Sequence, residues 1–336
     1  MSDPLLVVED LRVEFWTDRG TIYAVNGISF EIAAGETLGI VGESGCGKSV
    51  TSLALLGILP RAGRVAGGTA RFDGRDLFEL ADRDLRRIRG SEIAMIFQDP
   101  MSSLNPVLTI GKQIREVLET HFDLDRKAAD IRVTELLDQV GIPSAKARLK
   151  DYPHQFSGGM RQRAMIAMAL ACEPRLLIAD EPTTALDVTI QAQILDLLRT
   201  LVRDQGTALI MITHDLGVVA GMCERVNVMY AGTFVETGTA DPVFARPRHP
   251  YTLGLLQSVP RLDVGRVQAL QPIAGQPRNM LSPPSSCPFA SRCRYRLDRC
   301  SVELPVLGTM EHEHDTACFN PPKADEWQRT RLRTPA

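Results

Sequence analysis

Alternating apolar and polar residues fill the start of the chain, over residues 5–15 and 22–32. Such alternation predicts half-buried β-strands, because successive side chains of a strand point to opposite faces of the sheet. Residues 64–76 carry turn-forming glycines and a comparable pattern, which predicts another hairpin. We therefore expect an antiparallel β layer in the N-terminal part of the chain.

Short apolar runs without alternation are typical of strands that are buried on both faces of a parallel sheet. These runs cover residues 38–41, 92–97, 176–182 and 208–212. Other segments have helical patterns, over residues 82–89, 109–141, 164–171 and 190–203. This mixture predicts an α/β fold, and we interpret residues 101–153 as an inserted helical subdomain.

The composition agrees with a globular protein larger than one typical domain. The chain has 336 residues, of which 44% are hydrophobic and 24% are charged. A net charge of -3 gives no reason to expect nucleic acid as a partner. The longest apolar window, residues 50–60, is too short for a bilayer, and the N-terminus is acidic where a signal peptide is basic. We expect a cytoplasmic protein that can dock on a membrane partner.

A phosphate-binding motif, G-x-x-x-x-G-K-[ST], stands between the apolar run 38–41 and a helical segment. Its glycines permit positive φ angles and bring backbone N–H groups around an anion. Lys48 can reach the β- and γ-phosphates, and the Ser49 hydroxyl can bind Mg²⁺. The candidate ATP-binding residues of this loop are Gly42, Glu43, Ser44, Gly45, Cys46, Gly47, Lys48 and Ser49. The motif predicts a protein that binds a nucleoside triphosphate.

Two aromatic residues near the turn between the first two strands are candidates for stacking on an adenine ring. They are Phe15 and Tyr23. Each is also explained by ordinary packing of a half-buried strand, so the sequence does not choose between the two functions.

Polar residues follow three of the apolar strands, where the carboxyl ends of parallel strands meet at one edge of a sheet. Gln98 can meet the metal or the attacking water, and Asp180 can hold the Mg²⁺ shell. Glu181 can polarise the attacking water, and His214 can contact the γ-phosphate. Taken singly, the glutamine is explained as a surface turn residue, the two acids as the start of a loop, and the histidine as structural.

A second helix terminus in the chain is suited to an anion. Ser157 is a good N-cap, and the glycines that follow it, Gly158 and Gly159, expose amide donors. Two such termini in one chain predict either two different nucleotides or one nucleotide shared between two chains.

These motifs, in this order, resemble the nucleotide-binding subunits of ABC transporters over about the first 240 residues. The resemblance implies a P-loop NTPase cassette with a RecA-like core, an antiparallel β layer and a helical subdomain. By the same resemblance Gln98 is the Q-loop glutamine, Asp180 the Walker B aspartate, Glu181 the catalytic base and His214 the switch histidine. Residues 157–160 are then the signature, and residues 185–187 match a further family motif. The family binds each ATP between one P-loop and the signature of a partner.

The later part of the chain resembles the di- and oligopeptide importers, most closely the ATPase subunit of dipeptide importers. The similar segments are ARPRHPYT at 245–252, FQDPMSSLNP at 97–106 and ADEPTTALDVTIQAQI from residue 179. The resemblance implies two transmembrane permease subunits, a second ATPase and an extracytoplasmic peptide-binding protein. It also implies a peripheral location on the cytoplasmic face of the inner membrane. The alternatives are an importer of nickel or another small solute, and a soluble ABC ATPase outside transport.

The signature differs from the usual LSGGQ, because Phe156 stands in place of Leu and Met160 in place of Gln. The Ser-Gly-Gly donors remain, so phosphate contact is expected to survive. The missing glutamine favours a heterodimer with a more standard partner ATPase.

Four cysteines gather near the C-terminus, in a Pro-rich region with little hydrophobic periodicity. Four thiolates suit an iron–sulfur cluster or tetrahedral zinc. The spacing lacks C-x2-C pairs, which favours a [4Fe–4S] cluster. Zn²⁺ is the alternative, because His312 and His314 could act as zinc ligands. Four free thiols are the third possibility. Similar cysteines in the peptide importers are associated with such a cluster. The predicted cluster ligands are Cys287, Cys293, Cys300 and Cys318.

We expect an ATPase domain over 1–245 and a small cysteine-rich C-terminal extension over 246–336.

Overall fold

The computed structural model describes residues 3–184, 186–258, 273–311 and 314–323. Two compact units divide the chain. We call one the β-rich unit; it comprises Pro4–Ile32, Thr37–Phe78 and the chain from Ile212 onward. We call the other the helical unit; it consists mainly of Glu79–Met211 and Ala33–Glu36.

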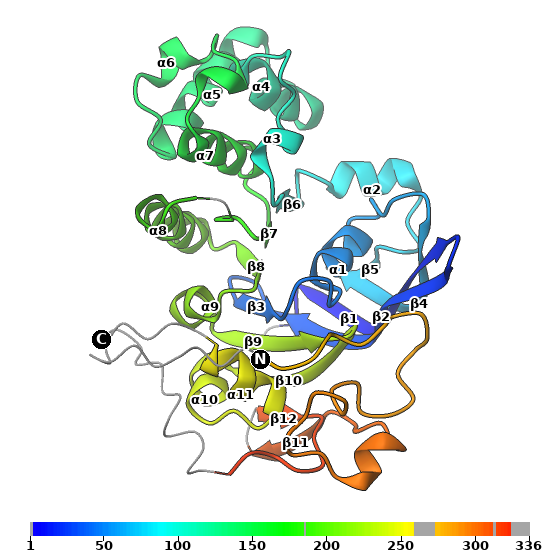
Figure 1. Cartoon of the computed structure of the whole chain (residues 1–336). Coiled ribbons are helices and arrows are strands. Elements are labelled where there is room, and N and C mark those ends of the chain that lie inside the picture. The colour runs from blue at the N-terminus through cyan, green and yellow to red at the C-terminus, as the bar shows by residue number, and fades with distance from the viewer. Residues whose placement is uncertain (1–2, 185, 259–272, 312–313, 324–336) are drawn as a thin grey trace, which may run out of the picture. The chain divides into compact units, whose positions relative to one another are not determined.

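An antiparallel sheet forms one part of the β-rich unit, as the alternation at the N-terminus predicted (Figure 1). Its strands run in the order β2-β1-β4-β5, with bounds Gly20–Ile32, Leu6–Thr17, Gly63–Phe72 and Arg75–Asp76. In β1, Leu6 lies opposite both Ile32 and Phe72, and all three side chains are fully buried. The apolar face of the sheet is therefore core, while its polar positions face solvent.

The strand before the phosphate-binding loop belongs to a second sheet of the same unit. Within this unit the strands run in the order β11-β12-β10-β9-β3, with bounds Gly308–Glu311, His314–Thr316, Thr233–Thr239, Arg225–Tyr230 and Thr37–Val41. β3 and β9 pair in parallel, with Leu38 opposite Arg225. The helices of this unit are α1 (Lys48–Leu55), α9 (Leu216–Met222), α10 (Ala240–Ala245) and α11 (Pro250–Gln257). A short 3-10 turn, η2, covers Asp298–Ser301.

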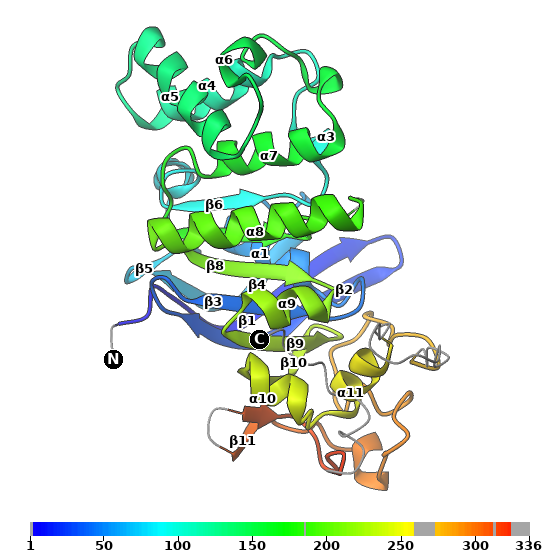
Figure 2. The same ribbon diagram turned by 90° about the vertical axis from the view of Figure 1, so that its left-hand side faces the viewer.

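Strands of the helical unit run in the order β8-β7-β6, with bounds Ala208–Thr213, Leu176–Asp180 and Ile93–Ile96. The boundary between the two units falls within β8, after Met211. β6 and β7 pair in parallel, with Ile93 opposite Leu176. The long helix α8 (Val188–Gln205) lies along these strands (Figure 2). Both strands were predicted from their unbroken apolar runs, and both are buried apart from the half-buried Met95.

Helices α3 to α7 of this unit form one group, in which α7 lies next to β6 (Figure 2). Their bounds are α3 Pro100–Ser103, α4 Ile110–His121, α5 Arg126–Gln139, α6 Ala145–Arg148, η1 Pro153–Gln155 and α7 Gly158–Ala169. The helical pattern over 109–141 is two helices, because Asp125 begins a new one by accepting the Ala128 N–H at 2.7 Å. The helix predicted from residue 164 begins at Gly158, since Ser157 caps it there.

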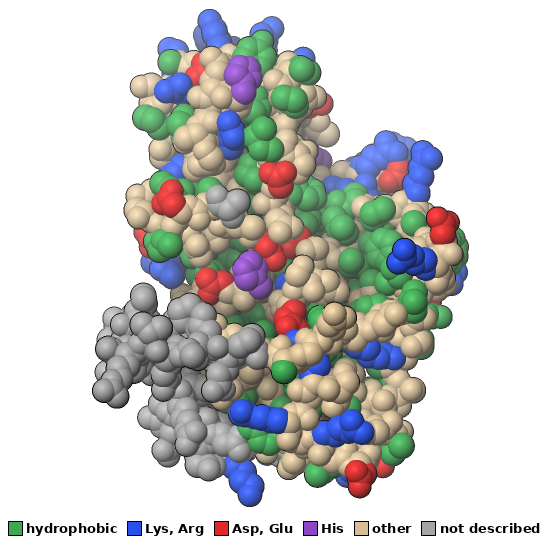
Figure 3. Space-filling model, in the orientation of Figure 1, with side chains coloured by type: hydrophobic (Ala, Val, Ile, Leu, Met, Phe, Trp, Pro, Cys, Tyr) green, Lys and Arg blue, Asp and Glu red, His purple; other side chains and the backbone are tan. Residues whose placement is uncertain are grey.

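A basic surface covers the short helix α2 (Asp82–Ile88) of the helical unit (Figure 3). Its arginines are exposed and pair along the helix, Arg86 with Asp82 and Arg87 with Asp84. Exposed pairs of this kind add little stability, so the helix is held mainly by its buried Leu85 and Ile88. None of the helices in the described residues has the length and apolar character that crossing a membrane requires.

Candidate functional site

The phosphate-binding loop lies between β3 and α1, and α1 begins at Lys48 as predicted. Gly47 has a φ of 112°, and a Cβ there would lie 2.5 Å from the carbonyl oxygen of Ala24. A side chain at this position would meet both backbone strain and a collision. The motif's second glycine is therefore required by the neighbouring strand β2 as well as by the loop.

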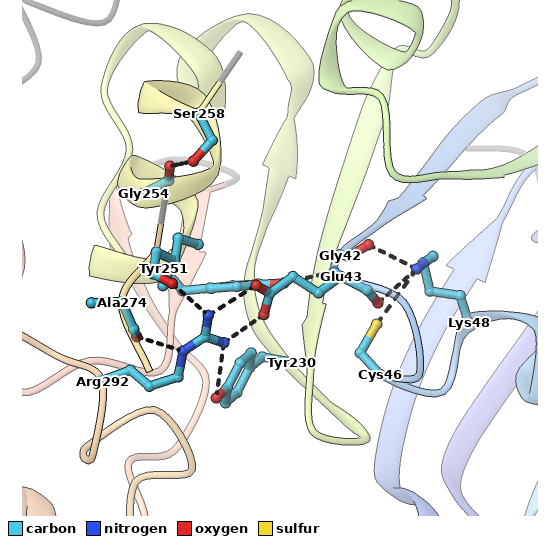
Figure 4. Close-up of polar contacts among 11 residues, drawn as sticks. Gly42, Glu43, Cys46, Lys48, Tyr230, Tyr251, Gly254, Ser258, Ala274 and Arg292 are labelled. Carbon is cyan, nitrogen blue, oxygen red and sulfur yellow. Dashed lines mark hydrogen bonds and ion pairs between the residues drawn. The ribbon is translucent and has the colours of Figure 1, made fainter. Parts of the chain in front are cut away.

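The ammonium of Lys48 lies over the loop, and the side chain is buried (Figure 4). Its Nζ donates to the carbonyl oxygens of Gly42 at 2.7 Å and Glu43 at 3.0 Å. It also lies 3.7 Å from the Cys46 sulfur. An ammonium has three N–H donors on a flexible stem, so it can exchange these carbonyls for phosphate oxygens without moving the backbone.

Cys46 lies inside the loop with its thiol buried. Burial raises its pKa, although Lys48 acts in the opposite direction. The thiol is therefore neutral near pH 7, and it is a weaker nucleophile than a free surface cysteine.

Two residues far along the chain also hold this loop, and the sequence analysis did not single them out. The hydroxyl of Tyr251 accepts the Glu43 N–H at 2.7 Å. The guanidinium of Arg292 pairs with the Glu43 carboxylate at 2.6 and 2.9 Å. No local signal marks Arg292 as a partner of a residue 249 positions away.

The carboxyl end of β7 carries the predicted acids of the helical unit. Asp180 is the last residue of the strand and is buried. Glu181 follows with a φ of 45°, a left-handed conformation that is uncommon for a residue with a side chain. Its Oε2 accepts hydrogen bonds from Gln98 Nε2 at 3.0 Å and from Thr184 Oγ1 at 2.8 Å. Thr184 is a third residue that the sequence analysis missed.

Gln98 uses its amide nitrogen for this bond, which leaves its Oε1 as the atom able to bind a cation. A serine hydroxyl, an amide oxygen and a carboxylate form a set of hard oxygen donors, which suits Mg²⁺. The residues proposed from the sequence, Ser49, Gln98 and Asp180, therefore fit that metal by chemistry.

The N-terminus of α7 carries the serine and glycines of the second motif. Ser157 Oγ accepts the Met160 N–H at 3.3 Å, which confirms the predicted N-cap. Ser157 and Gly158 are exposed, so the first amides of the helix face solvent. Gly159 lies against Ile190 of α8, where an added Cβ would come within 2.9 Å. Phe156 is buried, so the larger side chain in place of Leu fills core space.

His214 follows β8 directly in the β-rich unit and is exposed. The next residue, Asp215, caps α9 by accepting the Gly217 N–H at 2.8 Å. This cap fixes the chain direction immediately after His214.

The two aromatic candidates are both half-buried in the antiparallel sheet. The ring of Phe15 lies over Gly63, where an added Cβ would come within 2.6 Å of the ring. The backbone N–H of Tyr23 donates to the carbonyl of Met280 at 2.8 Å. Packing against Gly63 therefore accounts for part of the Phe15 ring, and the choice between the two aromatic residues stays open.

The prediction of an iron–sulfur cluster at Cys287, Cys293, Cys300 and Cys318 is wrong. Among the residues that the structure describes, no group of three or more His, Cys, Asp and Glu side chains is arranged to hold a metal ion. The described residues likewise hold no group arranged as a zinc site. His314 is bonded to the buried Glu236 at 2.7 Å, and His312 lies outside the described residues.

Free thiols and aromatic packing replace the predicted cluster. All four cysteines are free. Burial raises the pKa of Cys287, Cys293 and Cys318, so those thiols are neutral. The buried ring of Phe289 packs against Tyr230 and Tyr251, with centroids 5.2 and 5.4 Å apart. The segment is therefore anchored by Phe289 on aromatic rings of β9 and α11, which its weak periodicity did not reveal.

Two family models match the chain. The model described as ABC transporter matches residues 25–184. The model described as Oligopeptide/dipeptide transporter, C-terminal region, matches residues 235–300.

Curated relatives match nearly the whole chain. The oligopeptide transport ATP-binding protein OppD of Salmonella typhimurium is 54% identical over 320 residues, which are 95% of this chain and 95% of that protein. The dipeptide transport ATP-binding protein DppD of Bacillus subtilis is 53% identical over 318 residues, 94% of this chain and 95% of that protein. A solved dimeric structure of the ATP-binding cassette MJ0796, in a post-hydrolysis state with ADP and Pi, is 26% identical with a TM-score of 0.63. It covers 70% of this chain and 98% of that one.

Proposed function

The chain belongs to the ABC transporter family, among the ATP-binding subunits of oligopeptide and dipeptide transporters, and we propose here which of its residues bind ATP and which hydrolyse it. It is an ABC cassette that hydrolyses ATP to energise peptide import, as the sequence motifs predicted. The C-terminal match favours peptide over nickel or another small solute as the cargo.

ATP is proposed to bind along the phosphate-binding loop, residues 42–49, through backbone N–H groups, Lys48 and the Ser49 hydroxyl. Phe15 or Tyr23 is proposed to stack on the adenine. Mg²⁺, when bound through Ser49, Gln98 and Asp180, supplies charge neutralisation at the β- and γ-phosphates.

Glu181 is proposed as the general base that accepts a proton from the attacking water. The observation that carries this role is the geometry of its carboxylate, which two donors hold at the end of a buried strand. The left-handed backbone at Glu181 is a strain of the kind that concentrates at functional sites. His214 is proposed to contact the γ-phosphate.

A partner ATPase is proposed to complete the site with its own signature helix, while Ser157, Gly158 and Gly159 complete the partner's site. The exposed N-terminus of α7 supports this role, because its free amides and helix dipole suit an anion.

We further propose two permease subunits and an extracytoplasmic peptide-binding protein as partners. The chain would then lie on the cytoplasmic face of the inner membrane, with ATPase domain 1–245 and C-terminal extension 246–336.

Glu181→Gln tests the proposed base. An amide cannot take the proton, so we expect ATP hydrolysis to fall by about 10²–10⁴-fold while ATP binding is kept. Hydrolysis is measured by phosphate release in the complete transporter, and binding by calorimetry on the full chain. Glu135→Gln, at an exposed carboxylate of α5, is the matched control and keeps full activity. Unchanged hydrolysis by Glu181→Gln would assign the base to another residue.

A further inference from the structure

Glu43 places an acidic side chain inside a loop that is proposed to bind a triphosphate. A carboxylate there adds negative charge beside a polyanion, and like charges repel each other. An anion-binding loop with this residue therefore needs a nearby positive charge in addition to Lys48.

Arg292 supplies that charge from the C-terminal extension, residues 246–336, which we call the C-terminal segment (Figure 4). Its two terminal nitrogens pair with the two Glu43 oxygens at 2.6 and 2.9 Å. The Arg292 side chain is 3% exposed, against 29% for Glu43. A paired, largely desolvated contact of this kind is strong and directional, unlike the exposed pairs on α2.

The C-terminal segment also fixes the guanidinium in place. Arg292 donates to the backbone carbonyls of Ile273 and Ala274, each at 3.1 Å. Its guanidinium carbon lies 5.8 Å from the centre of the Tyr230 ring and 5.9 Å from that of Phe289. The positive charge is therefore built into the fold of this segment and does not sample solvent as a surface arginine does.

The backbone of Glu43 is held as well. Its N–H donates to the Tyr251 hydroxyl at 2.7 Å, and its carbonyl accepts from Lys48 at 3.0 Å. Burial raises the pKa of Tyr251, so the phenol stays neutral and can act as an acceptor. Two of the three groups that hold Glu43 thus come from residues beyond 245.

We propose that Arg292 is a positioning residue for ATP binding, which neutralises Glu43 and holds the start of the phosphate-binding loop. This inference rests on the proposed role of the loop as the ATP site. It makes the affinity for ATP depend on the folding of the C-terminal segment.

Arg292→Met tests the proposal in the full chain, because Met keeps apolar volume beside the two rings and removes the charge. Calorimetry with ATP and Mg²⁺ is expected to show affinity weakened by at least about tenfold, the effect of one uncompensated charge near an anion. Raising the ionic strength from about 0.05 M to about 0.5 M reduces this loss, because salt screens the repulsion. An unchanged affinity would overturn the proposal.

Glu43→Gln in the Arg292→Met chain separates charge from packing. Removal of the unpaired carboxylate is expected to restore at least about half of the lost affinity on a logarithmic scale. A loss that the second substitution does not restore, and that salt does not reduce, would show a purely structural role and overturn the proposal. If Arg292→Met does not fold, Arg292→Lys keeps the charge but cannot form the two-pronged pair with Glu43, so it is expected to weaken ATP binding by less than about tenfold. A larger loss in that variant, with unchanged thermal unfolding, would also contradict the proposal.

Two controls separate a failure of the proposed role of Arg292 from a failure of the proposed ATP site. Arg296→Ala removes the same charge from an exposed arginine of the same segment and leaves the affinity unchanged. Lys48→Ala abolishes ATP binding if the loop is the ATP site. Normal binding by Lys48→Ala would remove the proposed site, whereas its loss together with normal binding by Arg292→Met would remove only the role of Arg292.

Discussion

His249 is a buried histidine that links the start of a helix to the pH dependence of stability. Its side chain is 1% exposed, and its Nδ1 accepts the Tyr251 N–H at 3.1 Å as the cap of α11. Its backbone N–H donates to the buried carboxylate of Glu236 at 2.9 Å. Burial lowers the pKa of the imidazole to about 3, so the ring is neutral in the folded protein.

Acid is expected to destabilise the fold through this residue. An unfolded histidine has a pKa near 6.5, so between about pH 6.5 and about pH 3 the unfolded state binds a proton that the folded state does not. The free energy of unfolding then falls as the pH falls, by up to about 1.4 kcal/mol per pH unit. His249→Asn keeps a capping oxygen but does not titrate, so its stability changes less between about pH 6.5 and about pH 5.

Urea unfolding of both chains at these two pH values measures the difference. Glu236 and His314, the neighbouring titratable groups, are present in both chains, so their contributions largely cancel. Equal pH dependence of the two unfolding midpoints would contradict the assignment to His249.

At the scale of elements, the loop before α1 depends on its glycines unequally. Gly47 combines a φ of 112° with a close approach to the backbone of β2, as described above. Gly45 has a φ of 79°, but an added Cβ there would meet nothing within 4 Å. Gly47 is therefore constrained by backbone strain and by a close contact, whereas Gly45 is constrained by backbone strain alone.

Gly47→Ala is therefore expected to destabilise the chain by more than Gly45→Ala. The second substitution costs about 1 kcal/mol for the left-handed backbone, and the first adds a collision with a carbonyl oxygen that only a backbone shift can relieve. Thermal unfolding of the two full-length variants compares them directly. Equal melting temperatures would show that the close approach to Ala24 does not limit this position.

Most of the elements could be predicted because their signals are local. The alternation in β1 and β2, the apolar runs of β6 and β7, and the cap at Ser157 each depend on residues near one another in sequence. Arg292 escaped prediction because its role depends on a partner 249 residues away. Thr184 lies only three residues from Glu181, but its bond depends on the local backbone there, which includes the left-handed conformation of Glu181 that no sequence pattern predicted. The prediction of a metal cluster at the four cysteines failed because spacing along the chain does not fix where the thiols point.

At the scale of the molecule, the proposed ATP-handling residues are distributed over both compact units. The phosphate-binding loop and His214 belong to the β-rich unit, and Gln98, Glu181 and Ser157 belong to the helical unit. Closure of the dimer over ATP and its reopening after hydrolysis are proposed to drive the permease subunits.

The central claim is that ATP joins this chain to a partner ATPase, with the phosphate-binding loop of one facing the signature helix of the other. Sedimentation of Glu181→Gln with that partner, with and without ATP and Mg²⁺, tests it most directly, because blocked hydrolysis preserves the ATP-bound complex. The account predicts a one-to-one complex that forms only with ATP and is lost when Lys48→Ala is added. Sedimentation that ATP does not change, in a sample shown to have bound ATP, would contradict it.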